Sequence, residues 1–363
     1  RAGRMSIAVM EEAQRLTAAF VAAGAVPVET DILLSAETLL DLYGEDIRGR
    51  AYVTSDPLHG EMMLRPDFTL PVVQMHMQSR ADPARYTYAG PVFRRQEYDE
   101  ARANEFLQVG FEVFDGNDPA AADADVFAAI SGALAGLPLR ASTGDLGILM
   151  AAVRGLRTTD ARKAALLRHI WRPRRFRALL DRFGGRTAPP PTRTALLKMD
   201  DPFADAGADV GLRSRAEVQA RIDVLRQDAA AAPVSAEELS LIDALLDLRD
   251  VCPNALSALR DIAVDMPAIG AAVSTLAGRL DALAGRGVDV DGLDFEASYG
   301  RTTLEYYDGF VFGLSAIDRP DLPPVASGGR YDALTAVLGH GAAVPAVGGV
   351  VRPDLCLSLR GVA

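Results

Sequence analysis

Hydrophobic and polar residues alternate with the two-residue period of a strand along EFLQVGFEVF, residues 105–114. Successive side chains of a strand point to opposite faces of a sheet. A shorter stretch of similar character, YAGPVF at 88–93, lies on the other side of a charged segment. We therefore predict a hairpin whose second strand has one apolar and one polar face. The apolar face consists of Leu107, Val109, Phe111 and Val113, and the polar face of Gln108, Gly110 and Glu112.

The first 150 residues mix the periodicities of helices and strands. A helix is predicted over 6–23, because apolar residues recur there at three- and four-residue steps before Gly24. Two strands are predicted at 50–56 and 61–69 around a turn, followed by a helix at 71–79. The residues assigned to the apolar side of the first helix are Met10, Ala13, Leu16 (or Thr17) and Phe20.

From about residue 154 to 285 the chain is rich in Ala and Leu and helical in period, as in ARKAALLRHI and SAEELSLIDALLDL. Strand signals return near 293–298, 306–316 and 343–351. This order predicts one mixed domain that is interrupted by a helical insertion. The expected parts are residues 1–153 (core), 154–288 (insertion) and 289–363 (core).

The composition is typical of a globular protein: 49% of residues are hydrophobic and 24% are charged. No run of ~18 uncharged apolar residues occurs, so no membrane span is expected. The net charge of −11 disfavours non-specific binding to nucleic acid, which relies on Lys and Arg against phosphates. A basic stretch at 168–183 is compatible with a nucleic-acid patch, or with the solvated side of a helix beside an acidic neighbour, and the charge of the whole chain favours the second.

Two cysteines, Cys252 and Cys356, support neither a disulfide framework nor a thiolate metal site. The four histidines are scattered without the spacing of paired metal ligands. We therefore expect no metal and no cofactor. The N-terminal RAGRMSIAVMEEAQ lacks the long apolar segment of a signal peptide, so a reducing, cytoplasmic location is expected.

The polar side of the hairpin carries groups that complement a free amino acid. By the two-residue period, Tyr88 and Arg94 share a face of the first strand, and Gln108 and Glu112 share a face of the second. An α-amino acid needs an acceptor for its ammonium and a donor for its carboxylate. Gly110, between two polar residues, is expected to let a ligand approach the backbone. Spacing alone equally allows a half-exposed polar sheet face.

Three further segments change this balance: LRPDFT (64–69), LEYYDGFVF (304–312) and SGGRYDAL (327–334), the last interpreted as a Gly-Gly turn leading into a helix. With the hairpin, and followed by AVPAVGGVVRPDLC, they resemble in order the motifs of the class II aminoacyl-tRNA synthetase core. Within that class they resemble the histidyl-tRNA synthetase group. The resemblance covers about 5–150 and 290–360. It implies an α+β fold, in which an antiparallel sheet is flanked by helices and carries a helical insertion.

The resemblance also implies a pocket for histidine. The ammonium would meet a carboxylate, a hydroxyl and an amide. The imidazole, a good donor to a carboxylate, would meet a carboxylate and a tyrosine, and an arginine would meet the carboxylate of histidine or an ATP phosphate. In that order the implied residues are Asp67, Thr69 and Gln108, then Glu112 and Tyr306 with Tyr307 beside them, and Arg94.

Other positions depart from a working synthetase. Adenylation needs arginines over the nucleotide, yet Leu355 stands where the motif 3 arginine should be. Arg352, a long cation, takes a small-residue position and should obstruct the adenine pocket. Four residues before Tyr306, where an arginine is expected, the chain has Thr302. Arg301 is one residue off, which would point a strand side chain to the other face.

The chain therefore resembles the ATP phosphoribosyltransferase regulatory subunits, which are synthetase paralogues of histidine biosynthesis. It ends at Ala363, shortly after motif 3, so we expect no anticodon-binding domain. The resemblance implies a non-catalytic subunit that self-associates through its core, is required by a short-form catalytic subunit, and mediates inhibition by histidine. The rivals are a histidyl-tRNA synthetase or related ATP-dependent ligase, and a structural activator with a vestigial pocket.

Overall fold

A mainly antiparallel sheet of nine strands runs through the part of the chain that this computed structural model describes, which is residues 6–43, 47–95, 103–204, 206–207, 210–301 and 306–361. From edge to edge its strands are β1 (Val26–Pro27), β5 (Ala84–Phe93), β6 (Glu105–Phe114), β12 (Ala346–Val351), β11 (Ala326–Arg330), β10 (Phe310–Ala316), β7 (Leu139–Asp145), β9 (Asp294–Glu296) and β8 (Arg249–Val251). The pairs β1–β5 and β7–β9 are parallel. A small second sheet has the order β2 (Leu33–Ser35), β4 (Gly60–Leu64) and β3 (Val53–Asp56).

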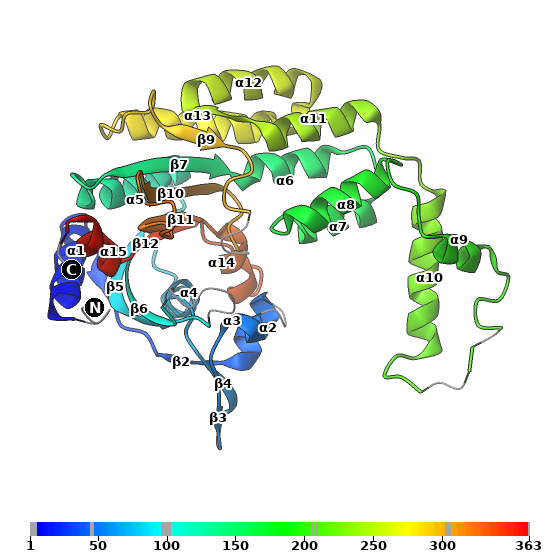
Figure 1. The fold of residues 1–363 in the computed structure, drawn as a ribbon, viewed down its shortest axis with the longest axis horizontal. Coiled ribbons are helices and arrows are strands. Elements are labelled where there is room, and N and C mark those ends of the chain that lie inside the picture. Colours follow the sequence, from blue (N-terminus) through cyan, green and yellow to red (C-terminus); the bar gives the residue numbers. More distant parts are fainter. Residues whose placement is uncertain are drawn as a thin grey trace.

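Helices flank the large sheet, so the predicted α+β architecture is confirmed (Figure 1). The first group is α1 (Ile7–Ala22), α2 (Ala36–Tyr43), α3 (Ile47–Arg50), α4 (Thr69–Ser79), α5 (Pro119–Ala133) and α6 (Leu146–Gly155). The expected insertion holds α7 (Asp160–Arg168), α8 (Pro173–Phe183), α9 (Pro191–Lys198), α10 (Arg215–Ala230), α11 (Ala236–Asp247), α12 (Cys252–Asp265), the short η1 (Pro267–Ile269) and α13 (Gly270–Ala284). The last two are α14 (Asp332–Leu338) and α15 (Pro353–Leu359). None of the described helices is long and apolar enough to cross a membrane.

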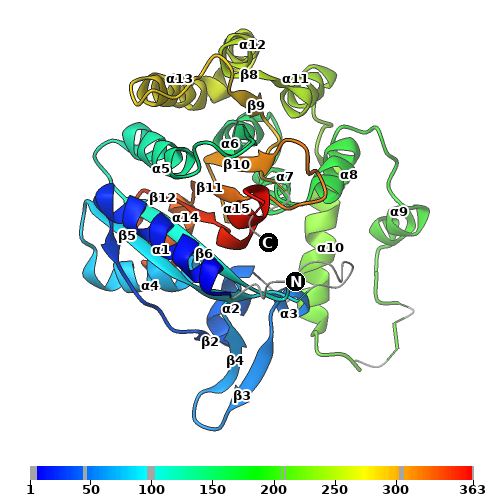
Figure 2. The same ribbon diagram turned by 60° about the vertical axis from the view of Figure 1, so that its left-hand side comes forward.

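The two faces of the sheet carry different clusters of buried residues. The odd-numbered side chains of β6, from Leu107 to Val113, pack with α1, α5 and α6, so the predicted apolar face is confirmed. On the opposite face, Phe106 and Phe114 pack with Tyr88, α4 and the tyrosines at 306, 307 and 331. Figure 2 shows α5 and α6 above β10, β11 and β12, and Figure 1 shows α2 and α4 below β11 and β12. The candidate site lies on this second face.

The first helix confirms the predicted period with one correction. The Ser6 side chain accepts the N–H of Val9 and begins the helix. Ala13, Leu16 and Phe20 are buried as predicted, but Met10 is 46% exposed and Val9 is buried in its place. Steps of four and three residues from Val9 lead to the same buried residues, Ala13, Leu16 and Phe20, as the steps from Met10. The helical period alone therefore did not decide whether Val9 or Met10 begins the buried side of the helix.

Gly328 and Gly329 lie inside β11 and not in a turn, which corrects the sequence-based interpretation. They pair with Gly349 and Gly348 of β12. A Cβ at Gly328 would come within 2.5 Å of the Phe312 ring, and one at Gly329 within 2.7 Å of the Tyr307 ring. These glycines therefore allow close packing over the sheet. The expected helix, α14, does follow.

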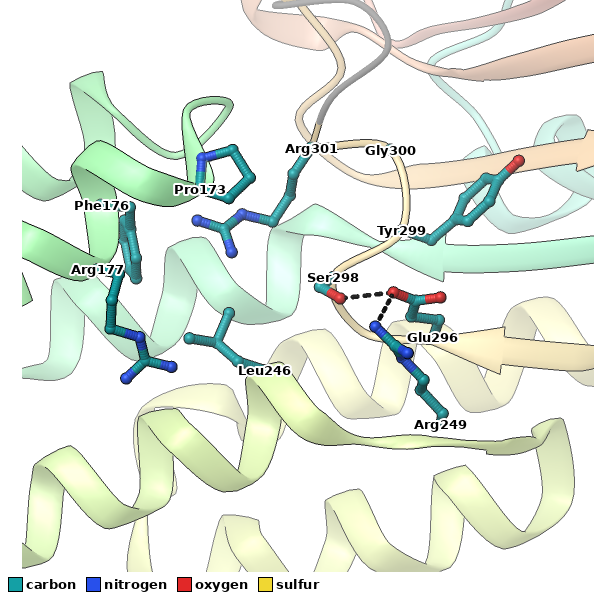
Figure 3. Close-up of a pocket in the computed structure, with 10 residues that line it drawn as sticks. All are labelled: Pro173, Phe176, Arg177, Leu246, Arg249, Glu296, Ser298, Tyr299, Gly300 and Arg301. Atoms are coloured by element: carbon teal, nitrogen blue, oxygen red, sulfur yellow. Dashed lines mark hydrogen bonds and ion pairs between the residues drawn. The ribbon is translucent and has the colours of Figure 1, made fainter. Parts of the chain in front are cut away.

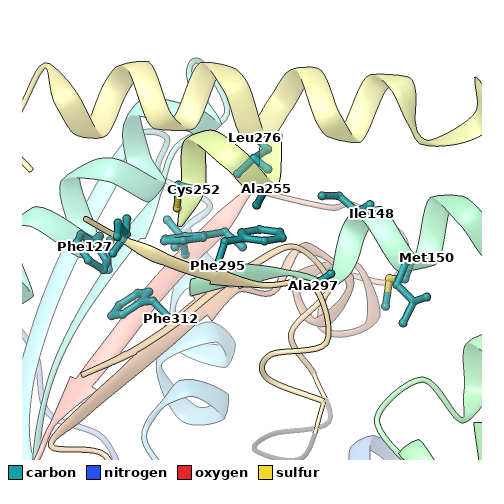
Figure 4. Packing of buried hydrophobic residues seen from close by; sticks show 14 of the residues in the cluster. Phe127, Ile148, Met150, Cys252, Ala255, Leu276, Phe295, Ala297 and Phe312 are labelled. Atoms are coloured by element: carbon teal, nitrogen blue, oxygen red, sulfur yellow. The ribbon is translucent and has the colours of Figure 1, made fainter. Parts of the chain in front are cut away.

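The insertion helices share a hydrophobic core with the sheet domain. Figure 4 shows Phe127 of α5 and Phe312 of β10 near Phe295 of β9, with Cys252 and Leu276 of α12 and α13 on the far side. All five belong to one buried cluster. The described part of this segment is mainly helical, while its assignment as an insertion with boundaries at 153 and 288 stays a prediction.

A buried charge network ties three parts of the chain together. Asp123 of α5 is 1% exposed and accepts 2.7 Å hydrogen bonds from Arg279 of α13 and from Arg330 of β11. Arg279 also donates to Asp145 at the end of β7, at 2.8 Å. Burial makes such pairs sensitive to the loss of one partner, because the remaining charge is left without its counter-ion.

We expect Asp123→Ala to lower the free energy of unfolding by roughly 3–5 kcal/mol, the range for breaking a buried ion pair. Urea denaturation followed by circular dichroism measures this change. Asp321→Ala is the matched control, because it removes the exposed partner of Arg319 and should cost only about 0–1 kcal/mol. Equal losses in the two variants would contradict a structural role of the network.

Candidate functional site

A cavity of about 240 Å³ opens on the second face of the sheet, between β6, β11, β12 and the start of α4. Six of the seven residues that the resemblance implies line it together, although they come from four separate parts of the sequence. They are Asp67, Thr69, Arg94, Gln108, Tyr306 and Tyr307. The rest of the wall consists of Pro323 to Ser327, Tyr331, Gly348 to Val350 and Arg352.

Oxygen acceptors gather at one side of this cavity. The Asp67 carboxylate accepts the backbone N–H of Thr69 at 3.1 Å and so begins α4. The Thr69 hydroxyl accepts from the Tyr306 hydroxyl at 3.2 Å. Gln108 is 2% exposed, and its Oε1 has no hydrogen-bond partner among the described residues. An orphaned buried acceptor is unfavourable unless a ligand supplies a donor.

Two arginines also line the cavity. Arg94 donates its Nε to the Pro66 carbonyl at 2.8 Å. The guanidinium carbons of Arg94 and Arg352 lie 5.5 and 4.1 Å from the centre of the Phe106 ring, a cation–π arrangement. Arg352 also pairs with Asp354 at 2.9 Å. The cavity wall therefore combines acceptors, a carboxylate and an amide oxygen, with two guanidinium groups.

Glu112, the seventh implied residue, does not line the cavity. It is 1% exposed and accepts hydrogen bonds from the hydroxyls of Tyr88 at 2.8 Å and Tyr331 at 2.6 Å. Burial raises the pKa of Glu112 to about 7, although both hydroxyls oppose the shift. Tyr331, which does line the cavity, therefore connects Glu112 to the cavity wall.

Two glycines beside Glu112 make room for protein side chains. A Cβ at Gly110 would lie 2.0 Å from the Tyr88 ring, so Tyr88 fills the space that was expected to admit a ligand. A Cβ at Gly348 would lie 1.4 Å from a carboxylate oxygen of Glu112. Gly348 is paired with Glu112 across the two strands, so this glycine is what allows a carboxylate to be buried here.

Sequence reasoning did not assign Tyr331 to the site. The Gly-Gly pair before it was interpreted as a turn, so no strand period was extended to it. Had residues 326–330 been taken as a strand, Tyr331 and Arg330 would have fallen on opposite sides of its end. That is the arrangement observed, since Arg330 contacts Asp123 and Tyr331 contacts Glu112.

Arg301 lies away from this cavity. Its Nε donates to the Ile170 carbonyl at 2.7 Å, and its guanidinium stacks on Phe176 of α8. Thr302 is outside the described residues. Leu355, at the position of the motif 3 arginine, is 7% exposed and is not part of the cavity wall. In the described part of the chain no group of His, Cys, Asp or Glu side chains is arranged to hold a metal ion.

Comparison with known proteins places the chain among relatives. The family model for histidyl-tRNA synthetase matches residues 6–232 and 214–354. The ATP phosphoribosyltransferase regulatory subunit of Brucella canis is 30% identical over 354 residues, which is 92% of this chain and 93% of the relative. The chain belongs to the family of ATP phosphoribosyltransferase regulatory subunits. The corresponding subunit of Brucella melitensis biotype 1 is also 30% identical, with 92% of each chain covered.

Solved structures show the same fold as this family member. One from Bacillus halodurans, described as an ATP phosphoribosyltransferase regulatory subunit/histidyl-tRNA synthetase, gives a TM-score of 0.68 at 22% identity and covers 97% of this chain and 79% of its own. The histidyl-tRNA synthetase of Nostoc sp. gives a TM-score of 0.63 at 16% identity, covering 98% and 72%. The predicted synthetase-like core is thereby confirmed as a fold.

Glu112 should make the stability of the protein depend on pH. Its pKa of about 7 in the folded state lies above the ordinary value of 4.5, so the folded protein holds this proton more tightly than the unfolded chain. Between pH 4.5 and 7 the contribution of Glu112 to stability should therefore fall as pH rises, and above 7 the loss should be complete.

The measurement is the unfolding free energy of the wild type and of Glu112→Gln between pH 5 and 8, in urea. The difference between the two should shift in favour of the variant as pH rises, because glutamine cannot ionise. Glu61→Gln, a change on exposed β4, should leave the wild-type pH profile nearly unaltered. A constant difference between Glu112→Gln and wild type would contradict a buried, titrating Glu112.

Proposed function

We propose that this chain is a non-catalytic regulatory subunit of ATP phosphoribosyltransferase, which carries out the first step of histidine biosynthesis. It would act with a short-form catalytic subunit and bind histidine, the feedback inhibitor, in the cavity described above. The family membership supports the first part. The combination of acceptors and guanidinium groups in the cavity wall supports the second, and the unsatisfied acceptor of Gln108 is the observation that carries it.

An α-amino acid matches the cavity in charge. Its ammonium would lie near Asp67, Thr69 and Gln108, which line the wall. Its carboxylate would face Arg94 and Arg352, since guanidinium groups bind carboxylates with charge-assisted hydrogen bonds. The same site would leave a buried oxygen unpaired with any ligand that lacks the ammonium.

The imidazole of histidine would be recognised through Tyr331. Because the Tyr331 hydroxyl donates its proton to Glu112 at 2.6 Å, its oxygen is left to accept from an imidazole N–H. Glu112 thus acts as a positioning residue that fixes the polarity of the tyrosine. The direct contact between Glu112 and imidazole implied by the synthetase resemblance is replaced by this indirect one.

Size and chemistry both favour binding over adenylation. Sites for small organic ligands commonly span roughly 300–1,000 Å³, so a cavity of about 240 Å³ suits one amino acid better than an amino acid together with ATP. The motif 3 position holds buried Leu355 in place of an arginine. Without that cation the charge that develops on ATP phosphates would lack one of its stabilising partners.

Regulation would follow from linkage between histidine and the catalytic subunit. If histidine binds one conformation of the assembly more tightly than another, it shifts the equilibrium toward that conformation. Coupling energies of about 1–3 kcal/mol, or roughly 5–150-fold in affinity, are typical. Self-association through the synthetase-like core would carry the same shift to further copies.

Histidine binding is tested by calorimetry on the purified chain, alone and with its catalytic partner. Gln108→Ala should weaken binding about tenfold or more, because it removes an acceptor for a charged donor. Gln78→Ala, on the exposed side of α4, is the matched control and should bind like the wild type. If histidine binds neither to the chain alone nor to the chain with its partner, only a structural activator role is left.

Inhibition of the assembled enzyme tests the residues around the imidazole. Glu112→Ala and Tyr331→Phe should weaken inhibition by histidine while activity without histidine is retained.

The rival function is tested by ATP–pyrophosphate exchange. The purified chain with histidine and ATP should give no exchange above a protein-free blank, because the motif 3 position lacks its arginine. A histidyl-tRNA synthetase assayed alongside provides the positive control. Clear exchange by this chain would replace the regulatory assignment with an activating enzyme.

A further inference from the structure

A second cavity, of about 390 Å³, lies where the insertion meets the core. Its wall comes from α8, α11, β8, β9 and the loop that follows β9 (Figure 3). The lining residues that carry charge are Arg177, Arg249, Arg301 and Glu296. None of them lines the candidate histidine site.

Arg301 is a buried cation for which the described residues provide no counter-ion. Its residue is 5% exposed, and within the described chain no carboxylate lies at ion-pair distance and its Nη2 has no hydrogen-bond partner. Its contacts are neutral: the Ile170 carbonyl at 2.7 Å, and the Phe176 ring with its centre 4.7 Å from the guanidinium carbon. A ring face compensates only part of a full charge, so burial of this group without an anion is costly.

The neighbouring arginines add further positive charge to the wall of this cavity. Arg249 pairs with Glu296 at 3.0 Å, and the Ser298 hydroxyl donates to the same carboxylate at 2.8 Å. Arg177 pairs with Asp243 of α11. Both of these carboxylates are thus already matched with an arginine, and among the described residues the charge of Arg301 is left over. In agreement, burial and then the charge of Arg177 lower the pKa of Arg301 to about 10.

We propose that this cavity binds a phosphate-bearing small molecule whose dianionic group is the counter-ion of Arg301. A planar guanidinium binds phosphate oxygens in pairs, and Figure 3 shows that the lining residues Arg177, Arg249 and Arg301 come from three different elements. A phosphate dianion carries two negative charges, so it balances Arg301 and leaves a charge for a second arginine of the wall. The volume of about 390 Å³ lies within the range of small-molecule sites, roughly 300–1,000 Å³, so room remains for the rest of a phosphate monoester.

Titration of the full-length chain with glycerol 3-phosphate and with inorganic phosphate, in phosphate-free buffer and followed by calorimetry, tests the site. Both probes should bind saturably at one site per chain. Arg301→Met should weaken binding roughly tenfold or more, as expected for the loss of charge-assisted hydrogen bonds. Arg319→Gln, an exposed arginine paired with Asp321, is the matched control and should bind like the wild type.

A second variant and a second readout keep the test decisive if Arg301→Met fails to fold. Arg249→Gln changes an exposed arginine at the rim and should weaken binding to a lesser extent. Hydrogen exchange should show protection by glycerol 3-phosphate at residues 249–251 and 298–301. The proposal is overturned if neither probe binds, if only inorganic phosphate binds, if Arg301→Met and Arg249→Gln both bind like the control, or if protection falls elsewhere. A histidine titration of the same samples reports separately on the function proposed above, which this site does not require.

Discussion

The arrangement of this protein depends on one buried carboxylate that is shared by two buried arginines. Asp123 receives Arg330 from the second part of the core and Arg279 from the insertion. All three residues are nearly inaccessible to water, so each charge relies on the others. Segments that are far apart in the sequence are therefore held in a fixed relation by an interaction that tolerates little displacement.

The same interaction also fixes the wall of the candidate site. Arg330 ends β11, and the next residue, Tyr331, points to the other side of the sheet, where its hydroxyl meets Glu112. Two contacts thus set the position of Tyr331. The preceding residue, Arg330, is held by Asp123, and the Tyr331 hydroxyl itself is held by Glu112. Gly348, opposite Glu112, provides the space that the carboxylate needs. The wall of the candidate site follows from these constraints together with Gln108, which alternation places on the same face as Glu112.

Much of this could be predicted from the sequence, because strand alternation is a local property. The two faces of β6 follow from it. The motifs, in their order along the chain, also indicate six of the residues that line the cavity. The failures concern contacts between distant segments. Nothing near Gly110 in the sequence indicates that Tyr88 fills its space, and nothing near Arg301 indicates that α8 lies against it.

The insertion makes contact with both ends of one segment of the core. Ile170 accepts a hydrogen bond from Arg301, and the next residue, Trp171, donates its indole N–H to the Tyr307 carbonyl at 2.9 Å. Trp171 therefore anchors the insertion to the core, which the sequence alone did not decide. Tyr307 lines the candidate histidine cavity and Arg301 lines the cavity at the insertion. Ile170 and Trp171 are adjacent in one turn, and each bonds to one of these two lining residues. A movement of this turn therefore either moves Arg301 and Tyr307 together, and with them parts of both cavity walls, or breaks one of the two hydrogen bonds.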